Sequence, residues 1–166
     1  MKVTQEQIIA VLRGKTVKQG RYTLAWRTVA PDFTSSHGFR WPFPGKTAVA
    51  DPGARTFTTG NPCPQFEGDG LCLAKTWAGA ASGGRAAATA LICAYQANDL
   101  LGDDTTKVRV SHAIVVEVID TYALIRAGHL SGADLSGAYL SGAYLSGANL
   151  RGATGAPPIG ANGYVS

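Results

Sequence analysis

The pattern of apolar residues at the start of the chain predicts one short helix. Thr4-Gln-Glu-Gln7 has the form of a capping box, whose two outer side chains satisfy backbone N–H groups at a helix start. The apolar residues of Ile8–Leu12 then fall largely on one helical face, and Gly14 stands where a helix C-cap belongs.

Most of the following segments predict strands and turns. The exception is Leu71–Ala81, whose residues are mostly small and apolar and which is followed by Ser82-Gly-Gly84; we expect a helix there. We expect irregular turns or short strands over Pro31–Pro64, which is dense in Pro, Gly, Ser and Thr, and a connecting turn over Asp99–Thr106. Segments rich in β-branched and aromatic residues predict three strands: Arg21–Val29, Thr89–Tyr95 and Val108–Ile119. Residues 1–120 therefore read as one mixed α+β domain that is mostly β.

Between Ile125 and Ala153 the apolar pattern changes to a period of five. Successive units read Leu-Ser-Gly-Ala plus one polar or aromatic residue, with Arg151 in place of one Ser. This period fits neither the ~3.6 residues of a helix nor the ~2 of a strand, so it requires a structure that turns once per unit. We expect the bends at the Ser-Gly pairs, because Gly accepts backbone conformations closed to other residues.

These units resemble the pentapeptide-repeat family, whose unit is written A(D/N)LXX and whose fold is a right-handed four-sided β-helix. The resemblance covers about six pentads, or about one and a half coils, if Ala123–Ile125 is a degenerate first unit. It implies a solenoid core of leucines and alanines: Leu130, Leu135, Leu140, Leu145, Leu150, Ala133, Ala138, Ala143 and Ala148. Because so short a coil cannot bury a core alone, it must lean on the preceding domain, on a second copy or on a partner.

The outward positions of the repeat favour protein contact over DNA mimicry. Some pentapeptide-repeat proteins imitate duplex DNA and bind gyrase, which demands many acidic side chains, whereas Asp134 is the single carboxylate here. Tyr139 and Tyr144 are expected to face outward, where Tyr supplies contact area at low entropic cost. We interpret them as an interface, with ordinary solvent-facing tyrosines as the alternative.

Composition indicates a globular protein of a reducing compartment. Hydrophobic residues make up 45% of the chain and charged residues 16%, yet no apolar run approaches the ~20 residues of a membrane span, and the N-terminus has no signal-peptide pattern. The chain has three cysteines, Cys63, Cys72 and Cys93, and an odd number favours free thiols over disulfide bonds. We expect a cytoplasmic protein without a membrane segment.

The net charge of +4 is concentrated in the first part of the chain. Residues 1–46 hold eight Lys or Arg against Glu6 and Asp32, which would attract an acidic partner by charge steering. The basic residues are scattered over different elements and no nucleic-acid-binding motif accompanies them. A solvated face is therefore the preferred interpretation, and nucleic acid is disfavoured as a partner.

The sequence lacks a motif for metal, phosphate or covalent catalysis. The cysteines, His37 and His112 have no close pair with metal-ligand spacing, and Gly79–Gly84 lacks the Lys-Ser/Thr of a phosphate-binding loop. Ser111 beside His112 has no orienting third group in the pattern. We expect no metal, no cofactor and no catalytic residue, and the sequence identifies no small-molecule substrate.

One loop combines Arg with aromatic residues. His37, Arg40 and Trp41, with Phe39 and Phe43 beside them, form a candidate contact for a partner or an anionic group, because Arg flanked by aromatic rings clamps such groups. The alternative is a set of aromatic residues that pack a core.

A second resemblance concerns the organisation of the whole chain. Gly68–Gly84, the following Leu-Leu-Gly-Asp-Asp-Thr-Thr stretch and the repeats together are similar to small pentapeptide-repeat proteins of actinobacterial phages. This implies a viral or prophage origin and a location in the cytoplasm of an infected bacterial host or in the virion.

These observations lead to one functional hypothesis and two alternatives. The first is a non-enzymatic structural or protein-interaction protein with a globular domain (1–120), a docking or stacking coil (121–154) and a Gly/Pro-rich tail (155–166). Its partner would be another protein or a second copy. The alternatives are a host-directed modulator that binds through the 37–45 loop and an enzyme of unknown reaction that uses His112, Glu117 or Cys93.

Overall fold

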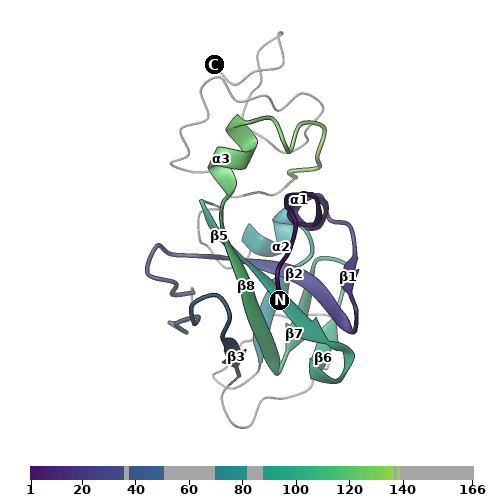
Figure 1. The fold of residues 1–166 in the computed structure, drawn as a ribbon, viewed down its shortest axis with the longest axis vertical. Coiled ribbons are helices and arrows are strands. Elements are labelled where there is room, and N and C mark those ends of the chain that lie inside the picture. Colours follow the sequence, from purple (N-terminus) through teal and green to yellow (C-terminus); the bar gives the residue numbers. More distant parts are fainter. Residues whose placement is uncertain (36–37, 51–69, 82–87, 137, 139–166) are drawn as a thin grey trace.

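The computed structural model shows a mostly β protein, and it describes residues 1–35, 38–50, 70–81, 88–136 and 138. Within these residues one antiparallel sheet has the strand order β3-β8-β5-β2-β4-β7-β6, and β1 pairs with β2 outside this path (Figure 1). The strands are β1 (Val17–Gln19), β2 (Tyr22–Val29), β3 (Thr47–Val49), β4 (Leu71–Ala74), β5 (Thr89–Gln96), β6 (Leu100–Asp103), β7 (Lys107–Val110) and β8 (His112–Asp120). The helices are α1 (Gln5–Leu12), α2 (Trp77–Ala81), α3 (Thr121–Arg126) and the 3-10 helix η1 (Ala97–Asp99).

Helix α1 has the caps that the sequence predicts. The Gln7 N–H donates to Thr4 Oγ1 at 3.2 Å, and the Thr4 N–H donates to Gln7 Oε1 at 2.9 Å, which completes the capping box. Gly14 has a φ of 77°, in the left-handed region that ends helices without strain only for glycine. The predicted helix and both of its ends are confirmed.

The centre of the sheet is the long pair of β2 and β5. All eight residues of Tyr22–Val29 pair with Thr89–Gln96, within one residue of the two predicted strands. Because successive strand residues point to opposite faces, Trp26 and Ile92 bury into one hydrophobic cluster while Ala25 and Leu91 bury into another.

The first cluster lies where the helices cover the sheet. The indole rings of Trp26 and Trp77 meet edge to face with centroids 4.7 Å apart, and Trp77 Nε1 donates to the Leu12 carbonyl oxygen at 2.7 Å. Residues of α1, α2 and α3 all join this cluster, so it ties the sheet to its helices.

The prediction of one helix over Leu71–Ala81 is wrong in its first half. Leu71–Ala74 is strand β4, which pairs with β7 and is buried at every position, and only Trp77–Ala81 is helical. A strand buried on both faces is uniformly apolar, so its local pattern does not separate it from a buried helix.

The chain around residue 105 also departs from prediction. The expected turn over Asp99–Thr106 contains strand β6, which pairs with β7 at the edge of the sheet. The expected single strand over Val108–Ile119 is divided into β7 and β8 at Ser111, whose N–H donates to the Asp99 carbonyl oxygen at 2.8 Å. Of the expected irregular region, the described part contains an isolated bridge between Thr34 and Arg40, and β3.

Candidate functional site

The start of the repeat packs on the sheet domain. Leu130 and Leu135 are completely buried and Ala133 is 4% exposed, and all three belong to the cluster that contains Trp26 and Leu12. Ala138 is partly buried against the same cluster. The sequence left three possible supports for the coil: the preceding domain, a second copy or a partner. Among the described residues, the start of the repeat packs against the preceding domain.

Two hydrogen-bonded turns follow one another at the repeat period. The Ala133 N–H donates to the Leu130 carbonyl oxygen, and the Ala138 N–H to the Leu135 carbonyl oxygen, each at 3.0 Å. Gly132, between the first pair, has a φ of 75°, as the third residue of a type II turn requires. The bend at the first Ser-Gly pair is where the sequence placed it.

The degenerate first pentad is not a repeat unit in the structure. Ala123–Ile125 lies inside helix α3, which begins where the Asp120 carboxylate accepts the Ala123 N–H at 2.9 Å. Asp is a strong helix N-cap, and this bond starts a helix over the residues that resemble a first repeat unit. The described residues show no right-handed coil of a β-helix, so the coil stays a prediction.

Helix α1 is hydrogen-bonded to the first turn of the repeat. Arg13 donates from one guanidinium nitrogen to the carbonyl oxygens of His129 at 3.1 Å and Ser131 at 2.7 Å. Gln5 Nε2 lies 3.1 Å from His129 Nε2. Sequence reasoning missed this junction, because Arg13 belongs to no motif and its acceptors are backbone atoms.

The remaining predicted residues of the repeat lie outside the described residues. They are Leu140, Leu145, Leu150, Ala143, Ala148 and the two candidate interface residues Tyr139 and Tyr144.

The loop with Arg and aromatic residues is divided between surface and core. Trp41 is only 2% exposed and packs edge to face against Phe39, with centroids 5.5 Å apart. Arg40 is exposed and lies 3.5 Å from Asp32, and Phe43 is 75% exposed. Trp41 thus takes the core position that the sequence left as the alternative, and Arg40 and Phe43 are accessible. His37 lies outside the described residues.

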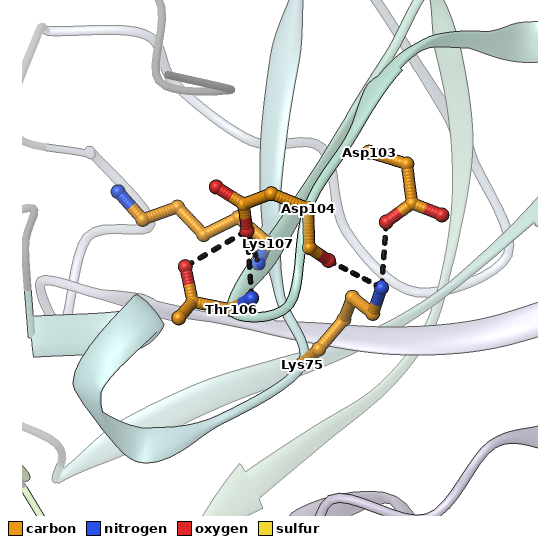
Figure 2. Close-up of polar contacts among 5 residues, drawn as sticks. All are labelled: Lys75, Asp103, Asp104, Thr106 and Lys107. Atoms are coloured by element: carbon orange, nitrogen blue, oxygen red, sulfur yellow. Dashed lines mark hydrogen bonds and ion pairs between the residues drawn. The ribbon is translucent and has the colours of Figure 1, made fainter. Parts of the chain in front are cut away.

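A hollow of about 210 Å³ opens between α1, β2 and β4. Lys15, Lys75, Tyr95 and Asp103 line it, together with small residues of β2 and β4. Lys75 Nζ donates to Asp103 Oδ1 at 2.6 Å and to the Asp104 carbonyl oxygen (Figure 2). Sequence reasoning missed this hollow, because its residues come from five separate segments and form no motif.

The turn beside the hollow is held by one carboxylate. Asp104 Oδ1 accepts the N–H groups of Thr106 and Lys107 at 2.6 and 2.9 Å and the Thr106 hydroxyl at 2.9 Å (Figure 2). Partial burial raises the pKa of Asp104, but these three hydrogen bonds together lower it below its ordinary value. The Thr106 carbonyl oxygen in turn accepts the Lys75 N–H at 2.8 Å, which fixes the turn to the entrance of α2.

Ser111, His112 and Asp99 lie together but do not form a relay. His112 Nδ1 is 2.9 Å from Ser111 Oγ and 3.6 Å from Asp99 Oδ1. A catalytic triad needs its hydroxyl and its carboxylate on opposite ring nitrogens, whereas both are on Nδ1 here. The three side chains are better explained as contacts between the β7–β8 junction and η1 than as an activated serine nucleophile.

The described cysteines are shielded from solvent in the folded state. Cys72 and Cys93 are buried free thiols, and burial raises the pKa of Cys93 to about 12, although Arg27 lowers it in part. A protonated, inaccessible thiol is a poor nucleophile and metal ligand. Cys63 lies outside the described residues, among which no group of three or more His, Cys, Asp or Glu gathers as a metal site would require.

No helix in the described ranges combines the length and the apolar character that crossing a bilayer needs.

Comparison with known families supports the repeat. Residues 123–154 match the family model described as "Pentapeptide repeats (8 copies)". No curated protein matched the chain, and no solved structure did. The family resemblance is therefore supported for this segment, and the preceding sheet domain has no counterpart among these comparisons.

Proposed function

We propose that this protein is a non-catalytic interaction protein whose pentapeptide repeats form a short coil that grows from the sheet domain and docks on another protein or on a second copy. The burial of Leu130 and Leu135 in the core of the sheet domain carries this proposal. A solenoid too short to be stable alone needs a cap at one end, and the sheet domain supplies it at the start of the repeat.

The described pentads also support an outward face for the two tyrosines. Tyr139 and Tyr144 stand directly before a repeat leucine, as Asp134 does before Leu135. Asp134 is exposed while Leu135 is fully buried. If the period continues, both tyrosines face solvent on successive sides of the coil, where a partner can bind them.

Sedimentation of the full-length protein tests this function. Self-association, or binding to a partner isolated with the wild type, should be weakened at least about tenfold in the double variant Tyr139→Ser/Tyr144→Ser, because buried interface tyrosines are frequent hot spots. Arg40→Gln is the matched control on the other candidate surface, and it should bind as the wild type does.

Two results would contradict the proposal. If Arg40→Gln abolishes association and the tyrosine variant does not, the loop is the interface and the modulator hypothesis replaces the coil. If the full-length protein is a strict monomer and captures no partner from the cells that make it, the docking function itself is wrong.

We place this function in a phage or prophage setting, on the resemblance of the whole chain. Quantitative mass spectrometry of purified virions tests the structural form of the proposal. Stoichiometric copies in the particle support it, whereas absence from the particle together with expression during infection favours the host-directed modulator.

A further inference from the structure

The hollow beside α1 arises where strand β2 changes partners. On one side β2 pairs with β5 along its whole length, but on the other side its partner changes from β1 at Leu24 to β4 at Trp26. Ala25 lies between these two pairings, and the diverging strands leave a space of about 210 Å³. The space is therefore built into the topology of the sheet.

The lining of this hollow includes the two ammonium-bearing residues Lys15 and Lys75. An ammonium group has three N–H donors, and Lys75 uses two of them for Asp103 and the Asp104 carbonyl oxygen. The Lys15 ammonium has no hydrogen-bond or ion-pair partner among the described residues. Two lysines and one carboxylate, Lys15, Lys75 and Asp103, line the hollow, so its lining carries one positive charge in excess.

Tyr95 adds a neutral donor to the same wall. Burial raises the pKa of its hydroxyl, as does the nearby Asp103 carboxylate, while a hydrogen bond from Thr23 lowers it. A phenol is protonated at neutral pH in any case, so the Tyr95 hydroxyl can serve as a neutral donor. Val11, Ala25 and Ala74 add an apolar part to the lining of the hollow.

We propose that this hollow binds a small organic monoanion, with its carboxylate between Lys15 and Lys75 and a compact apolar or aromatic part against Ala25 and Ala74. The single excess positive charge selects one negative charge, and the free N–H groups select an acceptor. The volume admits a one-ring acid but not a nucleotide.

Titration of the full-length ¹⁵N-labelled protein with benzoate, observed by NMR, tests this site. Saturable shifts are expected for the amides around Lys15, Thr23–Ala25 and Lys75, with a dissociation constant on the order of a millimolar. Benzyl alcohol has the same ring without the charge and should bind at least about tenfold more weakly, as should acetate, which has the charge without the ring.

Two exposed lysines provide a matched pair of variants. Lys15→Gln should weaken benzoate binding about five- to tenfold, because it removes a charge-assisted hydrogen bond at a partly solvated site. Lys46→Gln makes the same change of net charge before β3, away from the hollow, and should leave the titration unchanged. The proposal is overturned if benzoate gives no saturable shifts at these amides, if benzyl alcohol or acetate binds as well as benzoate, or if the two lysine variants behave alike.

Discussion

Arg13 and Ser131 lie 118 residues apart in the sequence, and the Arg13 guanidinium donates to the Ser131 carbonyl oxygen at 2.7 Å. The same nitrogen also donates to the carbonyl oxygen of His129. One side chain at the end of α1 thereby satisfies two backbone acceptors at the first turn of the repeat, which has no regular ladder to satisfy them.

Arg13→Gln should loosen this junction. We expect a loss of about 1 kcal/mol in the free energy of unfolding, because two charge-assisted but solvent-exposed hydrogen bonds disappear. Hydrogen exchange measured by mass spectrometry should rise for residues 127–138 and not for β5. Arg21→Gln, on an exposed arginine of the β1–β2 turn, is the control; equal exchange in both variants would show that Arg13 does not hold the repeat.

Leu135→Asp should destabilise the whole protein, because it places a carboxylate in a fully buried apolar site. We expect the free energy of unfolding to fall by about 3 kcal/mol or more. Leu140→Asp, at a position outside the described residues, is expected to have a similar effect.

Ala133→Leu should lower the free energy of unfolding by about 1 to 3 kcal/mol, because the larger side chain overcrowds the same space. Tyr139→Ser should stay within about 0.5 kcal/mol of the parent. Thermal melts check these values. If Leu135→Asp melts as the parent does while Tyr139→Ser is unfolded, the assignment of leucines to the inside and tyrosines to the outside of the coil is wrong.

Gly79→Ala should destabilise the protein although alanine favours helices. Gly79 lies in α2, and a Cβ added there would collide with the Thr106 carbonyl oxygen, which is backbone and is fixed by its bond to the Lys75 N–H. We expect a cost of about 1 to 3 kcal/mol from the clash, against a gain of about 1 kcal/mol from helix propensity. Urea unfolding measures the sum; a stabilised variant would mean that the Thr106 turn yields easily.

Acid should weaken the turn that Asp104 holds. Its carboxylate has a pKa below the ordinary 3.8 in the folded protein, so the unfolded chain takes up the proton first as pH falls. The stabilisation is therefore complete above about pH 5 and is lost as pH falls through 3.8 toward the folded pKa. Asp104→Asn should lower stability at pH 7 and reduce the further loss between pH 5 and pH 3, which urea unfolding at the three pH values detects. A parallel loss in parent and variant would contradict this role.

The sequence predicted those elements whose signals are local. The capping box of α1 and the β-branched runs of β2 and β5 each contain enough information to set their type and ends. Strand β6 was missed although it forms a hairpin with β7, because the Gly and Asp of Leu100–Asp103 favour a turn. Strand β4 was missed for a non-local reason: Leu71–Ala74 is a strand that pairs with β2 and β7, both distant from it in the sequence. The hollow escaped prediction for the same reason, since it exists only once β1 and β4 diverge from β2.

The junction of α1 with the first repeat turn also orders the events of folding during synthesis. Ribosomes release the chain from its N-terminus, so α1 and the strands β1 to β8 of the described sheet emerge before the first pentad does. The platform for Leu130 and Leu135 is complete when these leucines appear, and solenoid repeats propagate from a formed neighbour. The repeat is therefore expected to form from its first pentad toward its C-terminal end, on a sheet domain that has already folded.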